Sequence, residues 1–208
     1  MIKHYFNKDQ FYKKILKKKN DKRILKEYMK IKKYKKIIKF IYQNKPQGTG
    51  DAVLKTKKLI KNKYFLLLLP DDLIIGNNCS KKMISIHNKY KSSVIASMNV
   101  NKNKVSRWGI FKVKRKLSSN NFLIDDVIEK PSIKQAPSNK AVIGRYILPK
   151  SIFNKLKNIN KGKGDEIHIT DAIKSLILNK NKFVGHTFAG KYLDCGTMKG
   201  YIKSSKKF

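Results

Sequence analysis

The fold is decided by one stretch of sequence, Tyr64-Phe65-Leu66-Leu67-Leu68-Leu69-Pro70-Asp71-Asp72. A short, continuous apolar run is typical of a parallel strand that is covered on both faces. Pro70 ends the run, and Asp71 and Asp72 follow at its carboxyl end. In doubly wound sheets this edge is where ligands bind. The stretch therefore predicts a buried parallel strand with a ligand site at its end.

Predicted helices and strands alternate outward from this stretch. A helix at 80–90 and a strand at 92–100 follow it, which indicates an α/β protein with a mixed, mainly parallel sheet. No linker or internal repeat interrupts the pattern, so residues 1–208 are predicted to form a single domain. The first forty residues are predicted to be helical before the strand at 37–42, with a break near Asn20-Asp21. The other predicted strands are 109–113, 122–129, 141–148 and 183–188, with a short strand ending near Asp194. The other predicted helices begin near 51, 150, 168 and 197.

The formal net charge of +37 is the strongest compositional feature. It favours a polyanion-binding protein, but only four of the fifty basic residues are arginine, the side chain that reads guanine and phosphate best. The lysines accompany many Ile and Asn residues, a pattern that we attribute to compositional drift, and no specific nucleic-acid partner is predicted. No apolar run is long enough for a membrane span, no secretory signal is recognisable, and two distant cysteines suggest no disulfide framework. A cytoplasmic enzyme is the expected class, and a basic polyanion-binding protein stays open as an alternative.

Four short motifs carry candidate chemistry. Asp71 could hold Mg²⁺, which prefers a few carboxylates together with phosphates and water, or could simply end a strand. Gly48 lies in a glycine-rich turn before a helix, where the backbone can approach an anion, although ordinary turns look the same. Glu129 and Lys130 offer a hydrogen-bond acceptor for sugar hydroxyls and a cation for a phosphate. Asp194, before the last predicted helix, is either a second metal ligand or a helix cap.

The order of these motifs along the chain resembles the bacterial UTP–glucose-1-phosphate uridylyltransferase family over nearly all 208 residues. The motifs Ala136-Pro137-Ser138-Asn139 and Gly144-Arg145-Tyr146-Ile147-Leu148 are the most characteristic. The other matching motifs are Gln47-Gly48-Thr49-Gly50-Asp51-Ala52-Val53, Leu68-Leu69-Pro70-Asp71-Asp72-Leu73, Val105-Ser106-Arg107-Trp108-Gly109-Ile110, Val127-Ile128-Glu129-Lys130-Pro131, Glu166-Ile167-His168-Ile169-Thr170-Asp171-Ala172 and Asp194-Cys195-Gly196.

The resemblance implies a Rossmann-like nucleotidyltransferase fold and the formation of UDP-glucose and pyrophosphate from UTP and glucose 1-phosphate. This reaction depends on in-line positioning and on neutralisation of charge. The resemblance implies that Gln43 and Gly48 contact the uracil, that Gly109 and Glu129 bind the glucose and that Lys130 binds its phosphate as the catalytic residue. It also implies that Asp71 and Asp194 hold Mg²⁺.

One motif of the family does not appear in the sequence. The family begins with a strand and a Gly-x-Gly-Thr-Arg-x-x-Pro loop around the triphosphate, so the resemblance implies a chain truncated at its N-terminus. The loss of a central strand would expose sheet edges and an apolar face. An inactive remnant, or one half of a split enzyme, stays open as an alternative function. A separate N-terminal half and a homo-oligomer stay open as partners.

Overall fold

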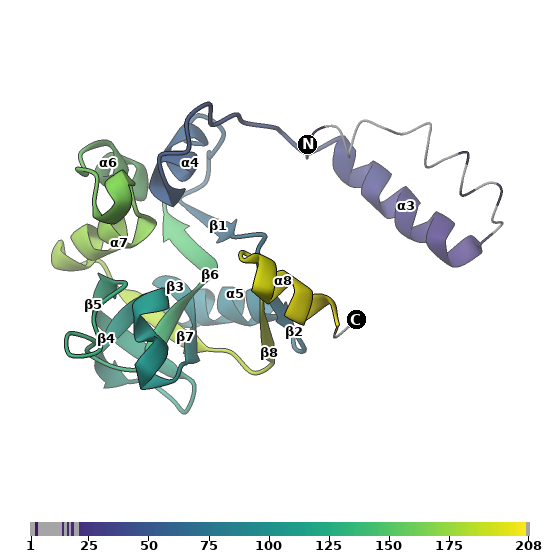
Figure 1. Ribbon diagram of the computed structural model, residues 1–208. Coiled ribbons are helices and arrows are strands. Elements are labelled where there is room, and N and C mark those ends of the chain that lie inside the picture. The colour runs from purple at the N-terminus through teal and green to yellow at the C-terminus, as the bar shows by residue number, and fades with distance from the viewer. Residues whose placement is uncertain (1–2, 4–13, 15, 17, 19–20, 207–208) are drawn as a thin grey trace. The chain divides into compact units, whose positions relative to one another are not determined.

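The computed structural model describes residue 3, residues 14, 16 and 18, and residues 21–206 (Figure 1). Two compact units divide the chain, residues 1–44 and residues 45–208, and each is described by itself. The prediction of a single domain over residues 1–208 stays a prediction. Within the described residues, no helix is long and apolar enough to cross a membrane.

The first unit contains helix α3 (Lys22–Lys35). Asp21 begins this helix, because its carboxylate accepts hydrogen bonds from the backbone N–H groups of Arg23 and Ile24 at 2.8 and 3.2 Å. The strand predicted at 37–42 does not form. A strand needs a neighbour for its backbone hydrogen bonds, and no described strand pairs with this segment, in which Ile37 is 74% exposed.

The second unit is built on a six-stranded sheet in the order β1-β6-β3-β7-β5-β4, in which β4 also pairs with β6. β3 and β7 run parallel, and every other described pairing in this sheet is antiparallel. The predicted mixed sheet is therefore confirmed, but its mainly parallel character is wrong for the described strands. The strands are β1 (Tyr64–Leu68), β3 (Ser93–Asn99), β4 (Gly109–Lys116), β5 (Asn121–Glu129), β6 (Lys140–Pro149) and β7 (Phe183–Thr187).

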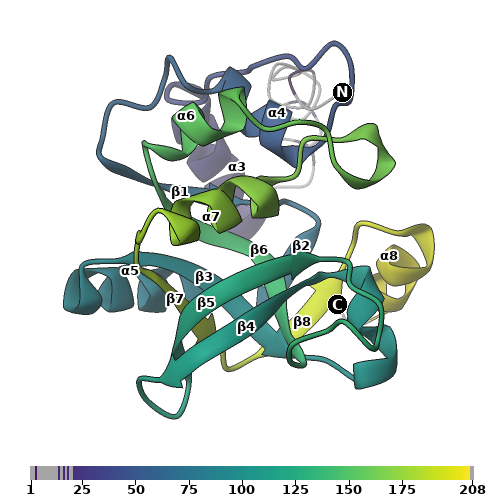
Figure 2. The ribbon, with the colours of Figure 1, turned by 90° about the vertical axis from the view of Figure 1, so that its left-hand side faces the viewer.

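Helices cover both faces of this sheet (Figure 2). α4 (Thr49–Lys55), α6 (Ile152–Lys157) and α7 (Ile169–Leu178) pack on one face, where Phe153 and Ile173 are fully buried. α5 (Cys79–Tyr90) packs on the other face through Met83. Successive residues of β3 alternate between the two cores, as the pleat of a strand requires. The three layers are those of the expected α/β class.

The strand predicted at 64–69 forms as β1, but it is an edge strand that runs antiparallel to β6. Phe65 and Leu67 face the core, whereas Leu66 and Leu68 are 38% and 47% exposed. The prediction of a buried parallel strand is therefore wrong. The run is apolar on both faces, yet within the second unit its other face is covered mainly at Tyr64, which packs against His87 of α5.

A separate two-stranded sheet follows the acidic end of β1. β2 (Asp72–Ile75) pairs antiparallel with β8 (Lys191–Asp194), and its register places Asp72 opposite Asp194. The short strand before Asp194 was predicted, whereas β2 was not. The helix predicted after Gly196 is α8 (Met198–Ser205), whose first turn is capped by Thr197. Two 3₁₀ turns, η1 (Lys102–Arg107) and η2 (Lys163–Asp165), complete the described elements.

Candidate active site

Glu129 lies at the last position of β5, directly opposite Gly109 at the start of β4. Its carboxylate is 18% exposed and accepts a hydrogen bond from the Thr170 hydroxyl at the first turn of α7, at 2.8 Å. A Cβ placed on Gly109 would lie 3.1 Å from Glu129 Oε2 and 3.2 Å from Thr170 Cγ2. Because Gly109 has no side chain, the space beside the Glu129 carboxylate, which Thr170 orients, stays open.

Lys130 follows Glu129 but does not continue the strand. Its φ of 44° lies in the left-handed region, and its backbone N–H donates to the Trp108 carbonyl at 3.1 Å. Consecutive residues of a strand point to opposite faces, so this turn is what allows both side chains to serve one site. Lys130 Nζ lies 4.0 Å from Glu129 Oε1.

These residues line one cavity of about 190 Å³. The predicted residues Gly109, Glu129 and Lys130 are all in its lining, so the structure brings them together. Further lining comes from α4, from the end of β1 and the start of β2, from η1, from β6 and from the segment that leads into α7. These residues include Thr49, Leu69, Asp72, Arg107, Trp108, Gly144, Glu166, His168 and Thr170.

Asp71 and Asp194 converge on Gly196. A Cβ on Gly196 would lie 2.6 Å from Asp71 Oδ2 and 3.6 Å from Asp194 Oδ1, so the two oxygens are at most about 6 Å apart. The backbone fixes this arrangement, because the Cys195 N–H donates to the Asp71 carbonyl at 2.8 Å and the Gly196 N–H donates to Asp194 Oδ1 at 3.0 Å. Because Gly196 has no side chain, a space stays open beside the two carboxylates; we call it the cradle of Gly196, and any other side chain would fill it.

Two oxygens that share one Mg²⁺ at about 2.1 Å lie within about 4 Å of each other, a separation that the upper bound of about 6 Å allows. Mg²⁺ keeps waters and phosphate oxygens as its remaining ligands. Among the described residues, no group of three or more His, Cys, Asp or Glu side chains could hold a metal ion. The protein would therefore supply two carboxylates and leave the other positions to substrate and water.

Arg107 links the carboxylate pair to the cavity. Its Nη2 lies 2.8 Å from Asp194 Oδ2, and its guanidinium lies 4.8 Å from the centre of the Trp108 ring. The Asp194 side chain is 26% exposed, so the pair is only partly screened by water. A cation that approaches Asp194 must compete with Arg107.

Asp72 differs from its neighbour Asp71 in that both of its oxygens are engaged. The Gly144 N–H donates to Oδ2 at 2.7 Å, and the Tyr192 hydroxyl donates to Oδ1. Burial raises the pKa of the Asp72 carboxyl above its usual value, and hydrogen bonds from Tyr192 and Gly144 oppose this shift. Asp72 therefore joins β2 to β6 and β8, a structural task.

The two residues predicted at the nucleotide are placed differently. Gly48 has a φ of 95°, and a Cβ there would lie 2.7 Å from the Ile167 carbonyl, so only glycine fits where this turn approaches the segment before α7. The neighbouring Gly50 N–H donates to the same carbonyl at 2.7 Å. Gln43 belongs to the unit of residues 1–44, which is described by itself. Its role stays a prediction.

Sequence reasoning assigned no role to Thr170, Arg107 or Tyr192. Each lies in or near a quoted motif, and each was overlooked because its partner is distant in sequence. The signal available for Arg107 was its rarity, since only four arginines occur in the chain. For Thr170 and Tyr192 the sequence contains no comparable signal.

Comparisons with known proteins show which family the chain belongs to. The model of the family described as "Nucleotidyl transferase" matches residues 4–208. A UTP–glucose-1-phosphate uridylyltransferase of Streptococcus pyogenes is 36% identical over 171 residues, which are 80% of this chain and 56% of that protein. The chain thus spans little more than half the length of that curated relative.

Solved structures give the same result over more of the chain. An apo UDP-glucose pyrophosphorylase superposes with a TM-score of 0.87 at 33% identity, covering 99% of this chain and 76% of that one. A UDP-glucose pyrophosphorylase in complex with UDP-glucose gives a TM-score of 0.76 at 38% identity, covering 81% and 65%. The predicted nucleotidyltransferase fold is confirmed, and the chain belongs to the nucleotidyl transferase family, among the UDP-glucose pyrophosphorylases.

Proposed function

We propose that the chain carries the sugar-binding and metal-binding parts of an enzyme that forms UDP-glucose and pyrophosphate from UTP and glucose 1-phosphate. The observation that carries the proposal is the cavity of Gly109, Glu129 and Lys130. There an oriented carboxylate and a cation lie 4.0 Å apart beside a glycine that leaves room for a ring.

Each side chain has a distinct task in this proposal. Glu129 accepts hydrogen bonds from the glucose hydroxyls, and Thr170 holds its carboxylate in place. Lys130 binds the phosphate of the sugar and keeps its oxygen in line with the α-phosphorus of UTP, which is the main requirement of phosphoryl transfer. Gln43 and Gly48 contact the uracil.

Asp71 and Asp194 would hold Mg²⁺ at the cradle of Gly196. When bound there, the ion supplies positive charge next to the reacting phosphates. The carboxylate oxygens at this position are hard ligands, which supports Mg²⁺ over softer metals.

We further propose that turnover requires a segment in addition to these 208 residues, supplied in the same chain or by a partner. The S. pyogenes relative is longer, since the match covers 56% of it. β1 has β6 as its described partner in the second unit, and its exposed Leu66 and Leu68 would gain cover from a further strand or helix.

Isothermal titration of the chain with glucose 1-phosphate tests the sugar site without requiring turnover. Binding is expected in the parent protein, and Lys130→Ala should weaken it by at least about tenfold, the loss of one charge-assisted contact. Lys134→Ala removes the same charge from an exposed position that lies outside the lining of the cavity and serves as the control. Equal affinities in Lys130→Ala and Lys134→Ala would remove Lys130 from the site.

A further inference from the structure

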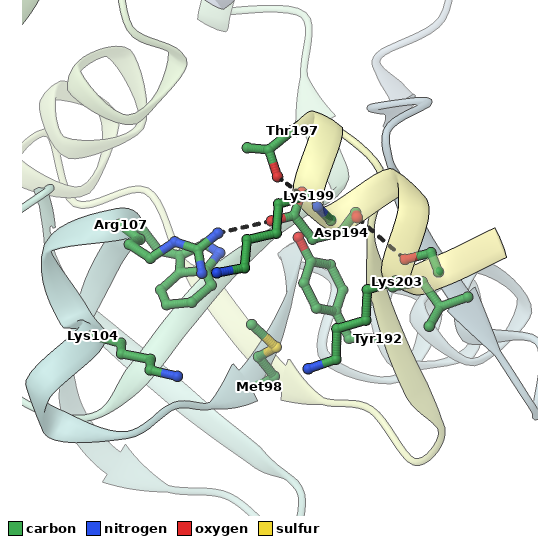
Figure 3. Close-up of a pocket in the computed structure, with 12 residues that line it drawn as sticks. Met98, Lys104, Arg107, Tyr192, Asp194, Thr197, Lys199 and Lys203 are labelled. Atoms are coloured by element: carbon green, nitrogen blue, oxygen red, sulfur yellow. Dashed lines mark hydrogen bonds and ion pairs between the residues drawn. The ribbon is translucent and has the colours of Figure 1, made fainter. Parts of the chain in front are cut away.

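The hollow beside α8 contains Arg107 and Asp194 and therefore adjoins the site described above (Figure 3). Another hollow, of about 510 Å³, shares no lining residue with it or with the cavity at Glu129. It lies where the end of α4 and the turn that follows it meet α6, two helices that lie side by side (Figure 2). We call it the α4–α6 hollow, and its lining consists of Leu54, Lys57, Lys58, Ile60, Lys61, Lys150 and Lys157.

The α4–α6 hollow combines an apolar floor with a rim of lysines. Leu54 and Ile60 form the floor, and both are partly buried against the core of the second unit. The other five lining residues are all lysines, and the lining contains no carboxylate. In the part of the chain that the structure describes, no ion pair joins any of these five lysines. An apolar lining with a few charged groups is typical of sites for small organic molecules.

The fold holds the rim in place. The Lys57 N–H donates to the Leu54 carbonyl at 3.1 Å, in the turn that follows α4. The Lys150 N–H donates to the Lys63 carbonyl at 2.8 Å, beside the pair of strands β1 and β6. Lys157 is the last residue of α6, whose buried side chains anchor this helix in the core. Three separate segments therefore bring their lysines to one place.

The positive charge of the rim exceeds what the neighbouring helix ends can neutralise. α4 and α6 both end at the hollow, and the C-terminal end of a helix carries about half a negative charge at most. Two such ends leave about four of the five lysine charges unbalanced. Repulsion by Lys157 lowers the pKa of the Lys57 ammonium below its usual value, and partial burial and repulsion by Lys150 add to this effect. A bound anion would relieve the repulsion.

We propose that the α4–α6 hollow binds a small phosphate monoester with an apolar body, at a site separate from the cavity at Glu129. A phosphate ester carries a charge of about −1.5 to −2 at neutral pH and has three acceptor oxygens, so one head group can contact several lysines at once. The apolar body covers Leu54 and Ile60 and removes their exposed surface from water. A wholly polar anion would use only the rim, and an uncharged apolar molecule would use only the floor.

Calorimetric titration of the protein with octyl phosphate tests this proposal. Saturable binding is expected, at least about tenfold tighter than that of inorganic phosphate, because burial of about two methylene groups already corresponds to such a factor. Lys57→Gln/Lys157→Gln should weaken the binding of octyl phosphate by at least about tenfold. Lys81→Gln/Lys82→Gln removes the same charge from exposed positions on α5 and should leave the affinity unchanged.

A second measurement locates the ligand. Only neutral amines react with acetic anhydride, so Lys57 should be acetylated faster than Lys58 in the free protein, as followed by peptide mass spectrometry. Octyl phosphate should slow the acetylation of Lys57 and leave that of Lys81 unchanged. Glutamine keeps part of the aliphatic stem of lysine, and the rim loses repulsion in Lys57→Gln/Lys157→Gln, so this variant should unfold at the same midpoint as the parent or a higher one.

Several results would overturn the proposal. Equal weakening by the two double variants would mean that diffuse charge explains the binding. Equal affinities for inorganic phosphate and octyl phosphate would exclude the floor, and unchanged acetylation of Lys57 at saturating octyl phosphate would exclude the rim. Competition by glucose 1-phosphate would place octyl phosphate in the cavity at Glu129, and the absence of saturable binding would end the proposal outright. The affinity for glucose 1-phosphate is measured by itself, so failure here leaves the proposed function standing.

Discussion

Two threonine-to-valine substitutions in this protein should have different effects on stability, because only one of them removes a hydrogen bond. The Thr170 hydroxyl donates to the Glu129 carboxylate at 2.8 Å, and Thr170 is 5% exposed. Thr187 Oγ1, on β7, is buried without a hydrogen-bond partner among the described residues. The substitution preserves the shape of the side chain in both cases and exchanges a hydroxyl for a methyl group.

A hydrogen bond to a charged group contributes about 1.5–3 kcal/mol, and a lost partner leaves Glu129 partly desolvated. Thr170→Val should therefore lower the free energy of unfolding by about 2 kcal/mol, or the midpoint of thermal unfolding by about 4–8 °C. Thr187→Val removes an unsatisfied buried hydroxyl and should be neutral or stabilising by up to about 1 kcal/mol.

Urea unfolding of the two variants, followed by circular dichroism, measures the difference. Calorimetry with glucose 1-phosphate then separates stability from function, because only Thr170→Val should also weaken binding of the sugar phosphate. A Thr170→Val variant as stable as the parent would show that this bond does not hold Glu129. Equal destabilisation of both variants would mean that the added methyl group is poorly accommodated at both positions.

Three further predictions follow from the site. Gly196→Ala places a methyl group 2.6 Å from Asp71 Oδ2, so the affinity of the protein for Mn²⁺ should fall several-fold. Electron paramagnetic resonance measures that affinity. Because residue 196 is exposed, the loss of stability should be limited to about 1 kcal/mol. Unchanged Mn²⁺ affinity would contradict the metal site. Burial raises the pKa of Asp72, so the ionised form of this carboxyl is disfavoured in the folded state. The stability advantage of the parent protein over Asp72→Asn should therefore shrink as the pH rises from below 3.8 to neutrality. A constant or growing advantage in urea unfolding would contradict that assignment. Residues 1–208 alone should give no UDP-glucose in a coupled assay with UTP, glucose 1-phosphate and Mg²⁺. Addition of the N-terminal segment of a relative should restore the formation of UDP-glucose. Turnover by the chain alone would refute the need for that segment.

Local sequence signals predicted most elements of the second unit because each carries its own pattern. The alternating apolar positions of β3 and the amphipathic helix α7 fill the two cores that the sheet separates. Pairing could not be predicted in the same way. The apolar run of β1 indicates burial but contains no information about which strand lies beside it, so its antiparallel edge position appears only in the structure.

The residues of the candidate site show the same contrast between what the sequence predicts and what only the structure shows. Glu129 and Lys130 were predicted together, and the left-handed backbone at Lys130 explains how neighbours in sequence can serve one cavity. Only the resemblance favoured Asp71 over Asp72 as a metal ligand, because the physical difference between the two lies in their partners. Asp72 is held by Gly144 and the Tyr192 hydroxyl, contacts that depend on β2, a strand too short to predict.

Arg107 connects the sugar cavity and the proposed metal site through a single charge. Its guanidinium lines the sugar cavity and pairs with Asp194, a carboxylate that we propose to hold the metal. One guanidinium cannot neutralise Asp194 and a bound sugar phosphate equally well, so an anion that attracts Arg107 leaves Asp194 more negative. A divalent cation then binds Asp194 more readily, and by reciprocity a bound cation favours the anion. We therefore expect the metal and glucose 1-phosphate to bind cooperatively, and replacement of Arg107 by a neutral residue should remove that cooperativity.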